Sequence, residues 1–292
     1  MSTYDAIIVG SGPNGLAAAI TLAQNELNVL VVEARDTIGG GTRTAELTLP
    51  GFQHDICSAI HPLGIASPFF RRLPLTDFGL EWIFPPIALA HPLDDGQAAV
   101  LTQSMDESAA SMGEDARAYK NLISPLVDSW QAILGDILGP LPLAPRHPFS
   151  LSRFGLRAVR ALRGLADSHF QSDAARALFA GLGGHGMLPL EEVTTASIAL
   201  VLGMLAHAVG WPIPKGGSQA ISTAMADYLI SLGGEIVTGQ EVASLDELPE
   251  SKAVLLDVTP RQVLQIAGDR LPTRYRQQLK KYRYGPGVCK VD

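Results

Sequence analysis

The stretch Gly10-Ser-Gly-Pro-Asn-Gly15 decides the fold, because it joins an apolar run at residues 5–9 to an alanine-rich segment at residues 15–24. Its glycine spacing is typical of a tight turn between a buried strand and a helix. Gly10 permits the turn, Gly12 lets the backbone approach a pyrophosphate, and Gly15 lets the helix pack closely on the strand. The helix N-terminus offers N–H groups and partial positive charge to phosphates. The stretch therefore predicts a dinucleotide site.

An acid follows at the distance that this site requires. A second apolar run, residues 28–33, ends in Glu33, eighteen residues after Gly15. A carboxylate at the end of that strand can accept hydrogen bonds from both ribose hydroxyls. Strand, helix and strand within thirty residues predict a right-handed parallel βαβ unit. The unit alone leaves NAD and FAD both open.

The continuation separates the two cofactors. Gly39 and Gly40 form a second glycine pair six residues after the acid, and Arg43 and Thr44 follow. This order of acid, glycine pair and hydroxyl residue resembles the flavin amine oxidase and phytoene desaturase superfamily. The resemblance implies that the loop runs beneath the pyrophosphate and ribitol of FAD. Glycines let the backbone lie against an extended cofactor, and Arg43 can neutralise one phosphate.

Within that superfamily the chain most resembles the phytoene dehydrogenase-related proteins, including the group of pyridine nucleotide-disulfide oxidoreductase domain-containing protein 2. The matching stretches are residues 50–55, 57–62, 206–212, 214–218 and 233–242. In relatives the residue at Val242 meets the adenine through its backbone. The resemblance implies an FAD site made of Gly10, Gly12, Pro13, Asn14, Gly15, Glu33, Ala34, Gly39, Gly40, Arg43, Thr44 and Val242.

The predicted fold class is α/β, with two interleaved domains. An FAD/NAD(P)-binding Rossmann-like domain with a parallel sheet takes residues 1–68 and 215–272. An α+β substrate domain with a helical insertion takes residues 69–214 and 273–292. Members of the family are longer, so the chain is expected to be truncated at its C-terminus, inside a substrate-domain strand at residues 287–291. An unpaired strand favours association with a second chain or a homo-oligomer.

Composition excludes several classes. The formal net charge of -7 argues against nucleic acid as a partner. Cys57 and Cys289 stand far apart with no CxxC spacing, so a zinc or other metal site and a redox dithiol are not expected. The N-terminus runs straight into a strand without a leader, which predicts a cytoplasmic protein.

Two helical segments bear on membrane contact. The apolar residues 196–210 are too short to span a bilayer and predict a buried helix. Residues 152–165 predict a basic amphipathic helix, which is either a solvated surface helix or a contact with an anionic membrane surface. Its basic face holds Arg153, Arg157, Arg160 and Arg163, opposite Phe154, Leu162 and Leu165.

Gly181-Leu-Gly-Gly-His-Gly186 repeats the glycine spacing, but a helical run precedes it and Pro189 follows. Without a strand before it, this segment is predicted to be a loop that ends a helix, not a second nucleotide site.

The sequence says less about the catalytic residues than about the cofactor site. Desaturation by a flavin removes a hydride and a proton, and His61, His185 and His207 are candidate bases that are equally compatible with structural roles. Apolar residues at 69–82 and 198–211 are compatible with a channel for a hydrophobic substrate or with a core.

The leading hypothesis is an FAD-dependent oxidoreductase that takes a hydride from a hydrophobic substrate. The alternatives are an NAD(P)-dependent dehydrogenase, and an inactive nucleotide-binding remnant or half of a split enzyme.

Overall fold

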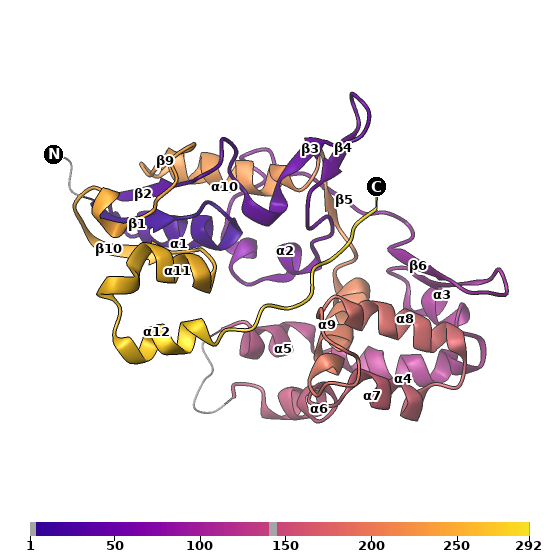
Figure 1. Ribbon diagram of the computed structural model, residues 1–292. Helices are drawn as coiled ribbons and strands as arrows, with labels where there is room; N and C mark the ends of the chain where they lie inside the picture. Colours follow the sequence, from indigo (N-terminus) through magenta and orange to yellow (C-terminus); the bar gives the residue numbers. More distant parts are fainter. Residues whose placement is uncertain (1–3, 140–144, 292) are drawn as a thin grey trace.

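The computed structural model describes residues 4–139 and 145–291. Its largest sheet has four parallel strands in the order β10-β1-β2-β9 (Figure 1). The two central strands are almost wholly buried, as expected for parallel strands that are covered on both faces. The strands are β1 (Tyr4–Val9), β2 (Val29–Val32), β9 (Glu235–Val237) and β10 (Ser251–Leu256).

Alternate residues of these strands face two separate cores. Ile8 and Val31 pack with α1 (Pro13–Ala23) and α10 (Gln219–Ser231) on one face. Ile7 and Val32 pack on the other face with Val242 and with Ile266 of α11 (Pro260–Ala267). The predicted βαβ unit and parallel sheet are confirmed. Val242 lies in an irregular segment after β9.

A helical part follows in the middle of the chain (Figure 1). Its core surrounds α9 (Thr195–Ala208), whose Leu200, Met204 and Leu205 are fully buried, which confirms the buried helix predicted there. No helix of the described residues is long and apolar enough to cross a membrane. The other helices are α3 (Met105–Ala110), α4 (Ala116–Val127), α5 (Trp130–Ile137), α6 (Pro148–Ala158), α7 (Leu162–His169) and α8 (Asp173–Gly184).

In the described part of the chain, three short antiparallel strand pairs lie outside the large sheet. Strand β3 (Thr44–Glu46) pairs with β4 (Gln53–Asp55), β5 (Trp82–Ile83) with β8 (Ile213–Pro214), and β6 (Leu89–Pro92) with β7 (Ala98–Leu101). Helix α2 (Pro62–Ala66) follows β4, and α12 (Thr273–Lys280) follows α11. The division into domains at residues 68, 214 and 272 stays a prediction.

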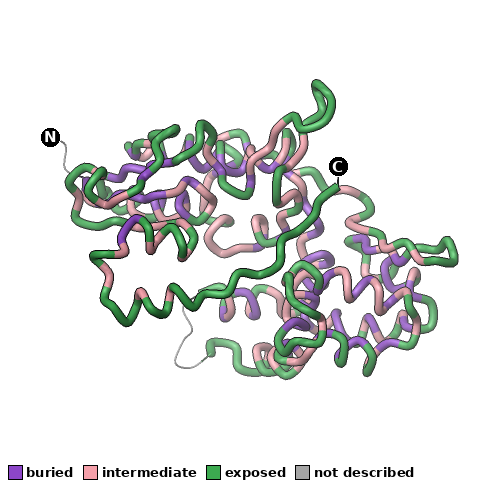
Figure 2. The backbone as a smooth tube through the Cα atoms, viewed as in Figure 1, coloured by how far each residue is buried: buried purple, intermediate pink, exposed green. Residues whose placement is uncertain are grey.

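Two expected elements differ. The helix predicted at residues 152–165 is broken between α6 and α7, where Val159 ends one helix and the extended Ala161 begins the next. Residues 287–291 form no strand, and the run from Tyr282 to Val291 is exposed (Figure 2). No described strand pairs with that run, so its backbone has no ladder of hydrogen bonds to hold it as a strand. The glycine segment at residues 181–186 was predicted to be a loop, but its first four residues form the last turn of α8, and the helix ends at Gly184.

Candidate functional site

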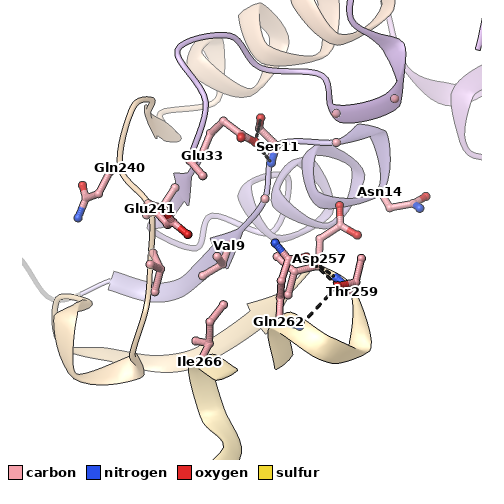
Figure 3. A pocket seen from close by; sticks show the side chains of 18 of the residues that line it. Val9, Ser11, Asn14, Glu33, Gln240, Glu241, Asp257, Thr259, Gln262 and Ile266 are labelled. Atoms are coloured by element: carbon pink, nitrogen blue, oxygen red, sulfur yellow. Dashed lines mark hydrogen bonds between the residues drawn. The ribbon is translucent and has the colours of Figure 1, made fainter. Parts of the chain in front are cut away.

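A cleft of about 480 Å³ opens where β1, β2 and β10 end (Figure 3). Its volume falls in the range of small-molecule sites, and carboxyl ends of parallel strands are where such sites form. The lining residues are Val9, Gly10, Ser11, Gly12, Pro13, Asn14, Val32, Glu33, Ala34, Gly40, Gly41, Gln240, Glu241, Val242, Asp257, Val258, Thr259, Gln262, Gln265 and Ile266. Most of the predicted cofactor residues are therefore brought together.

The three glycines of the first motif differ in what surrounds them. A Cβ on Gly10 would lie 2.4 Å from the Asp257 carbonyl oxygen, and one on Gly15 would lie 2.1 Å from the Gly10 carbonyl oxygen. Gly10 also has a φ of +106°, which L-residues rarely adopt. A Cβ on Gly12 would meet one atom within 4 Å, Asp257 Oδ2 at 3.4 Å. Gly10 and Gly15 are thus required by packing, whereas Gly12 faces the open cleft.

Asp257 is a site residue that the sequence analysis missed. Its Oδ2 accepts a hydrogen bond of 2.7 Å from the backbone N–H of Gly15, in the first turn of α1. Helix α1 begins after Gly12, which has no side chain to cap it, so Asp257 caps the helix from a neighbouring strand. The sequence did contain a sign of this residue, because an acid follows the apolar residues 253–256 just as Glu33 follows β2.

Glu33 is buried at the opposite side of the glycine turn. Its Oε2 accepts hydrogen bonds from the backbone N–H and the hydroxyl of Ser11, at 2.9 and 2.6 Å, and its Oε1 accepts one of 2.9 Å from the Arg35 N–H. Burial alone would raise the pKa of Glu33, but these hydrogen bonds and the charge of Arg43 bring it below its usual value. Glu33 is therefore a carboxylate at neutral pH.

The second glycine loop packs directly on the first. Gly39 donates its N–H to the Ser11 carbonyl oxygen at 3.0 Å, and a Cβ on Gly40 would lie 3.2 Å from the Cα of Gly12. Gly40 begins a short 3-10 turn, Gly40–Thr42, that forms one wall of the cleft. The two loops thus meet through backbone alone, and together they line one side of the cleft.

Four predicted residues lie outside the lining of the cleft: Gly15 and Gly39, which belong to the two glycine loops described above, and Arg43 and Thr44. Arg43 donates from Nε to the Gly40 carbonyl oxygen at 3.0 Å and so ties down the second loop. Thr44 donates from Oγ1 to Asp55 Oδ1 at 2.6 Å and packs against Gly217. Their direct contact with a cofactor stays a prediction. Among the described residues, no cluster of histidine, cysteine or acidic side chains could hold a metal ion.

The three candidate histidines occupy different surroundings. His207 is buried in the helical part, with Nε2 2.7 Å from the Tyr119 hydroxyl and Nδ1 3.1 Å from the Gln103 carbonyl oxygen. His185 is exposed at the end of α8 and has its ring against carbonyl groups of that helix. Neither adjoins the cleft lining.

His61 lies nearer to the glycine loops. Its Nε2 is 2.7 Å from the Ser218 hydroxyl, which donates to the Ser58 carbonyl oxygen at 2.7 Å. Ser58 in turn donates its backbone N–H to the carbonyl oxygen of Gly41, a residue of the cleft wall. Burial lowers the pKa of His61 despite the nearby Asp55, so the imidazole is neutral at pH 7. Because the Ser218 hydroxyl has one hydrogen, Nε2 of the neutral ring donates to it and Nδ1 retains a lone pair.

A family model for an NAD(P)-binding Rossmann-like domain matches residues 8–73. Pyridine nucleotide-disulfide oxidoreductase domain-containing protein 2 of Mus musculus is 27% identical over 86% of this chain and 50% of its own length. A 4,4'-diapophytoene desaturase from Methylomonas sp is 25% identical over 84% of this chain and 48% of its own length. The predicted resemblance is confirmed, and the chain spans about half the length of these relatives.

Over a shorter stretch the sequence identity to another relative is higher. A 41-residue stretch is 54% identical to flavin-containing amine oxidase A of Equus caballus, over 14% of this chain and 8% of that protein. An oxidoreductase from Methanosarcina mazei has the same fold, with a TM-score of 0.63 and 18% identity over 94% of this chain and 64% of that one.

Proposed function

We propose that this chain binds FAD and forms the nucleotide-binding part of an oxidoreductase that takes a hydride from an apolar substrate. The observation that carries this proposal is the contact between the two glycine loops, Gly40 against Gly12, with Glu33 at one end of the cleft. A nicotinamide cofactor needs the first loop and the acid. The second loop adds a backbone wall that suits a longer cofactor, and a 41-residue stretch of the chain is 54% identical to a flavin-containing amine oxidase.

The cleft residues fit the ADP half of FAD. Glu33 can accept the ribose hydroxyls, the N–H groups at the start of α1 face the position of the pyrophosphate, and the backbone at Val242 borders the adenine side. Gly12 leaves open the space that a phosphate needs. FAD, when bound, supplies the hydride acceptor, and the protein orients the two reactants.

His61 is the favoured proton acceptor among the three histidines. Its hydrogen bond to Ser218 fixes the ring, and its neutral state leaves Nδ1 able to take a proton. Next to it, Gly64 and Trp82 border a second cavity of about 270 Å³, lined mainly by apolar side chains. This neighbourhood supports an apolar substrate. The lining is Gly64, Ile65, Phe70, Arg71, Leu73, Leu75, Thr76, Leu80 and Trp82.

Absorbance and titration test the cofactor. The purified chain, or the chain titrated with FAD, should show flavin bands near about 370 and 450 nm. FAD should bind at least about tenfold more tightly than NAD⁺, because the second loop contacts the part that NAD⁺ lacks. Equal affinity for the two would favour the NAD(P)-dependent alternative, and binding of neither would favour the inactive remnant.

The substrate class needs a second measurement. Under anaerobic conditions an apolar terpene should bleach the 450 nm band of the FAD-loaded chain, whereas a polar diamine should not. His61→Gln should slow that bleaching by about 10²-fold or more while FAD affinity stays unchanged. Bleaching by the diamine alone would exclude the apolar substrate, and an unaffected His61→Gln variant would exclude His61 as the proton acceptor.

A further inference from the structure

Helix α6 carries large apolar side chains on its outer face. Phe149 is 91% exposed and Leu156 is 75% exposed, and Val159, at the end of the helix, is 60% exposed. Phe149 and Leu156 stand two helical turns apart, so they lie on one face. The opposite face buries Phe154 and Ala158 in the core of the helical part. Isolated exposed apolar residues are ordinary, but a row along one helix is not.

The apolar residues that the sequence predicted to face a membrane are therefore buried and cannot contact one. Phe154, Leu162 and Leu165 are 6%, 0% and 0% exposed and belong to the core. The exposed apolar side chains are instead those on the outer face of α6. Thr194 donates its N–H to the Val159 carbonyl oxygen at 3.1 Å, which brings the neighbouring Val193, 68% exposed, to the same side.

Arginines surround this row. Residues 146–163 contain five arginines and no acidic residue, in a chain whose formal net charge is -7. Within the described chain, Arg146, Arg153, Arg157 and Arg160 form no ion pair with a carboxylate; Arg163 pairs with Glu191 and Asp167. Arg153 follows Phe149 by four residues and so lies on the same outer face, whereas Arg160 lies beyond the end of α6 and donates to the Gly164 carbonyl oxygen and the Ser168 hydroxyl. Positive charge is thus concentrated where the apolar side chains are exposed.

We propose that this outer α6 surface, made of Phe149, Leu156 and Val159 with Arg153 and Arg157, binds the surface of an anionic lipid bilayer. A helix with exposed apolar side chains and flanking arginines lies in the interface, with the apolar residues in the acyl boundary and the guanidinium groups on lipid phosphates. The same surface suits nucleic acid poorly, because its centre is apolar. In Figure 1, α6 lies at the edge of the helical part away from the sheet, so a bilayer there would leave the nucleotide cleft open.

Vesicle co-sedimentation of the full chain tests the proposal. Vesicles of about three parts phosphatidylcholine to one part phosphatidylglycerol should bind it at least about tenfold more strongly than pure phosphatidylcholine, and added salt should weaken the binding. Phe149→Ser with Leu156→Ser should reduce binding about tenfold or more, as should Arg153→Glu. Phe52→Ser with Ile230→Ser removes two other exposed apolar side chains, 61% and 57% exposed, and should leave binding unchanged.

Circular dichroism of each variant confirms that it is folded, since all these side chains are largely exposed. Equal binding to neutral and anionic vesicles, no binding to either, or unchanged binding of the Phe149/Leu156 variant would each overturn the proposal. A concentration-dependent dimer in light scattering that this variant abolishes, without vesicle binding, would assign the surface to a second copy of the chain instead.

Discussion

Gly12 is the glycine whose missing side chain leaves room for a ligand. Gly12→Val should abolish FAD binding and leave the folded state almost as stable, because the protein itself has open space there. Gly15→Val is the contrasting variant. Its Cβ would meet the Gly10 carbonyl oxygen at 2.1 Å, so its melting temperature should fall. FAD titration and thermal unfolding measure both, and normal FAD affinity in Gly12→Val would place the phosphate site elsewhere.

Glu33 is expected both to bind the cofactor and to hold the glycine turn through Ser11. Glu33→Ala should weaken FAD binding by roughly 1.5–3 kcal/mol, because a charge-assisted acceptor is lost. It also removes the acceptor for both Ser11 donors, so Glu33→Gln, which keeps one carbonyl oxygen there, should lose less. Glu192→Ala, at an exposed glutamate in the helical part, is the control. An unchanged FAD dissociation constant in Glu33→Ala would contradict the assignment.

Helix α1 depends on a cap that comes from outside the βαβ unit. Asp257→Ala should lower stability by about 1 kcal/mol, the usual cost of a lost N-cap. Asp257→Asn keeps an oxygen that can accept from Gly15 N–H and should recover most of that loss. Denaturant unfolding of the two variants checks this. If both behave like the parent chain, the 2.7 Å contact contributes nothing to the helix.

The buried His207 of α9 contacts Tyr119 of α4, and its contribution to the stability of the fold depends on pH. Burial lowers the pKa of His207 in the folded state, and burial also raises the pKa of its partner Tyr119. The unfolded chain therefore binds an additional proton below about pH 6.5, so stability should fall as the pH decreases through that value. His207→Gln should flatten this dependence and His185→Gln, at an exposed position, should not. Melting temperatures measured from about pH 7.5 to 5.5 decide it; equal slopes would exclude His207.

At the scale of the whole molecule, the nucleotide cleft is separate from the C-terminal run. The cleft lining ends at Ile266, and the described residues from Tyr282 onward are exposed and outside regular structure. Limited trypsin digestion should therefore cut first between Lys280 and Lys290, leaving the sheet intact and FAD binding unchanged. First cleavage within the helical part, or loss of FAD binding with the first cut, would show that this run is held more firmly than its exposure indicates.

The sequence by itself determined the βαβ unit, its glycine turn and the acid Glu33. Each of these depends on neighbours within about thirty residues, where backbone sterics and hydrophobic period act locally. It also indicated the buried helix at residues 196–210 and the helix-ending role of the second glycine repeat, for the same reason.

The other features of the site depend on contacts between residues that lie far apart in the sequence. Asp257 reaches Gly15 across 242 residues, because β10 pairs with β1 and places its end beside the turn. Tertiary packing likewise places His61 beside Ser218, 157 residues away, and the packing of α4 on α9 places His207 beside Tyr119. Which face of α6 is buried depended on packing, because residues 148–165 have apolar side chains on both sides and spacing alone does not choose between them.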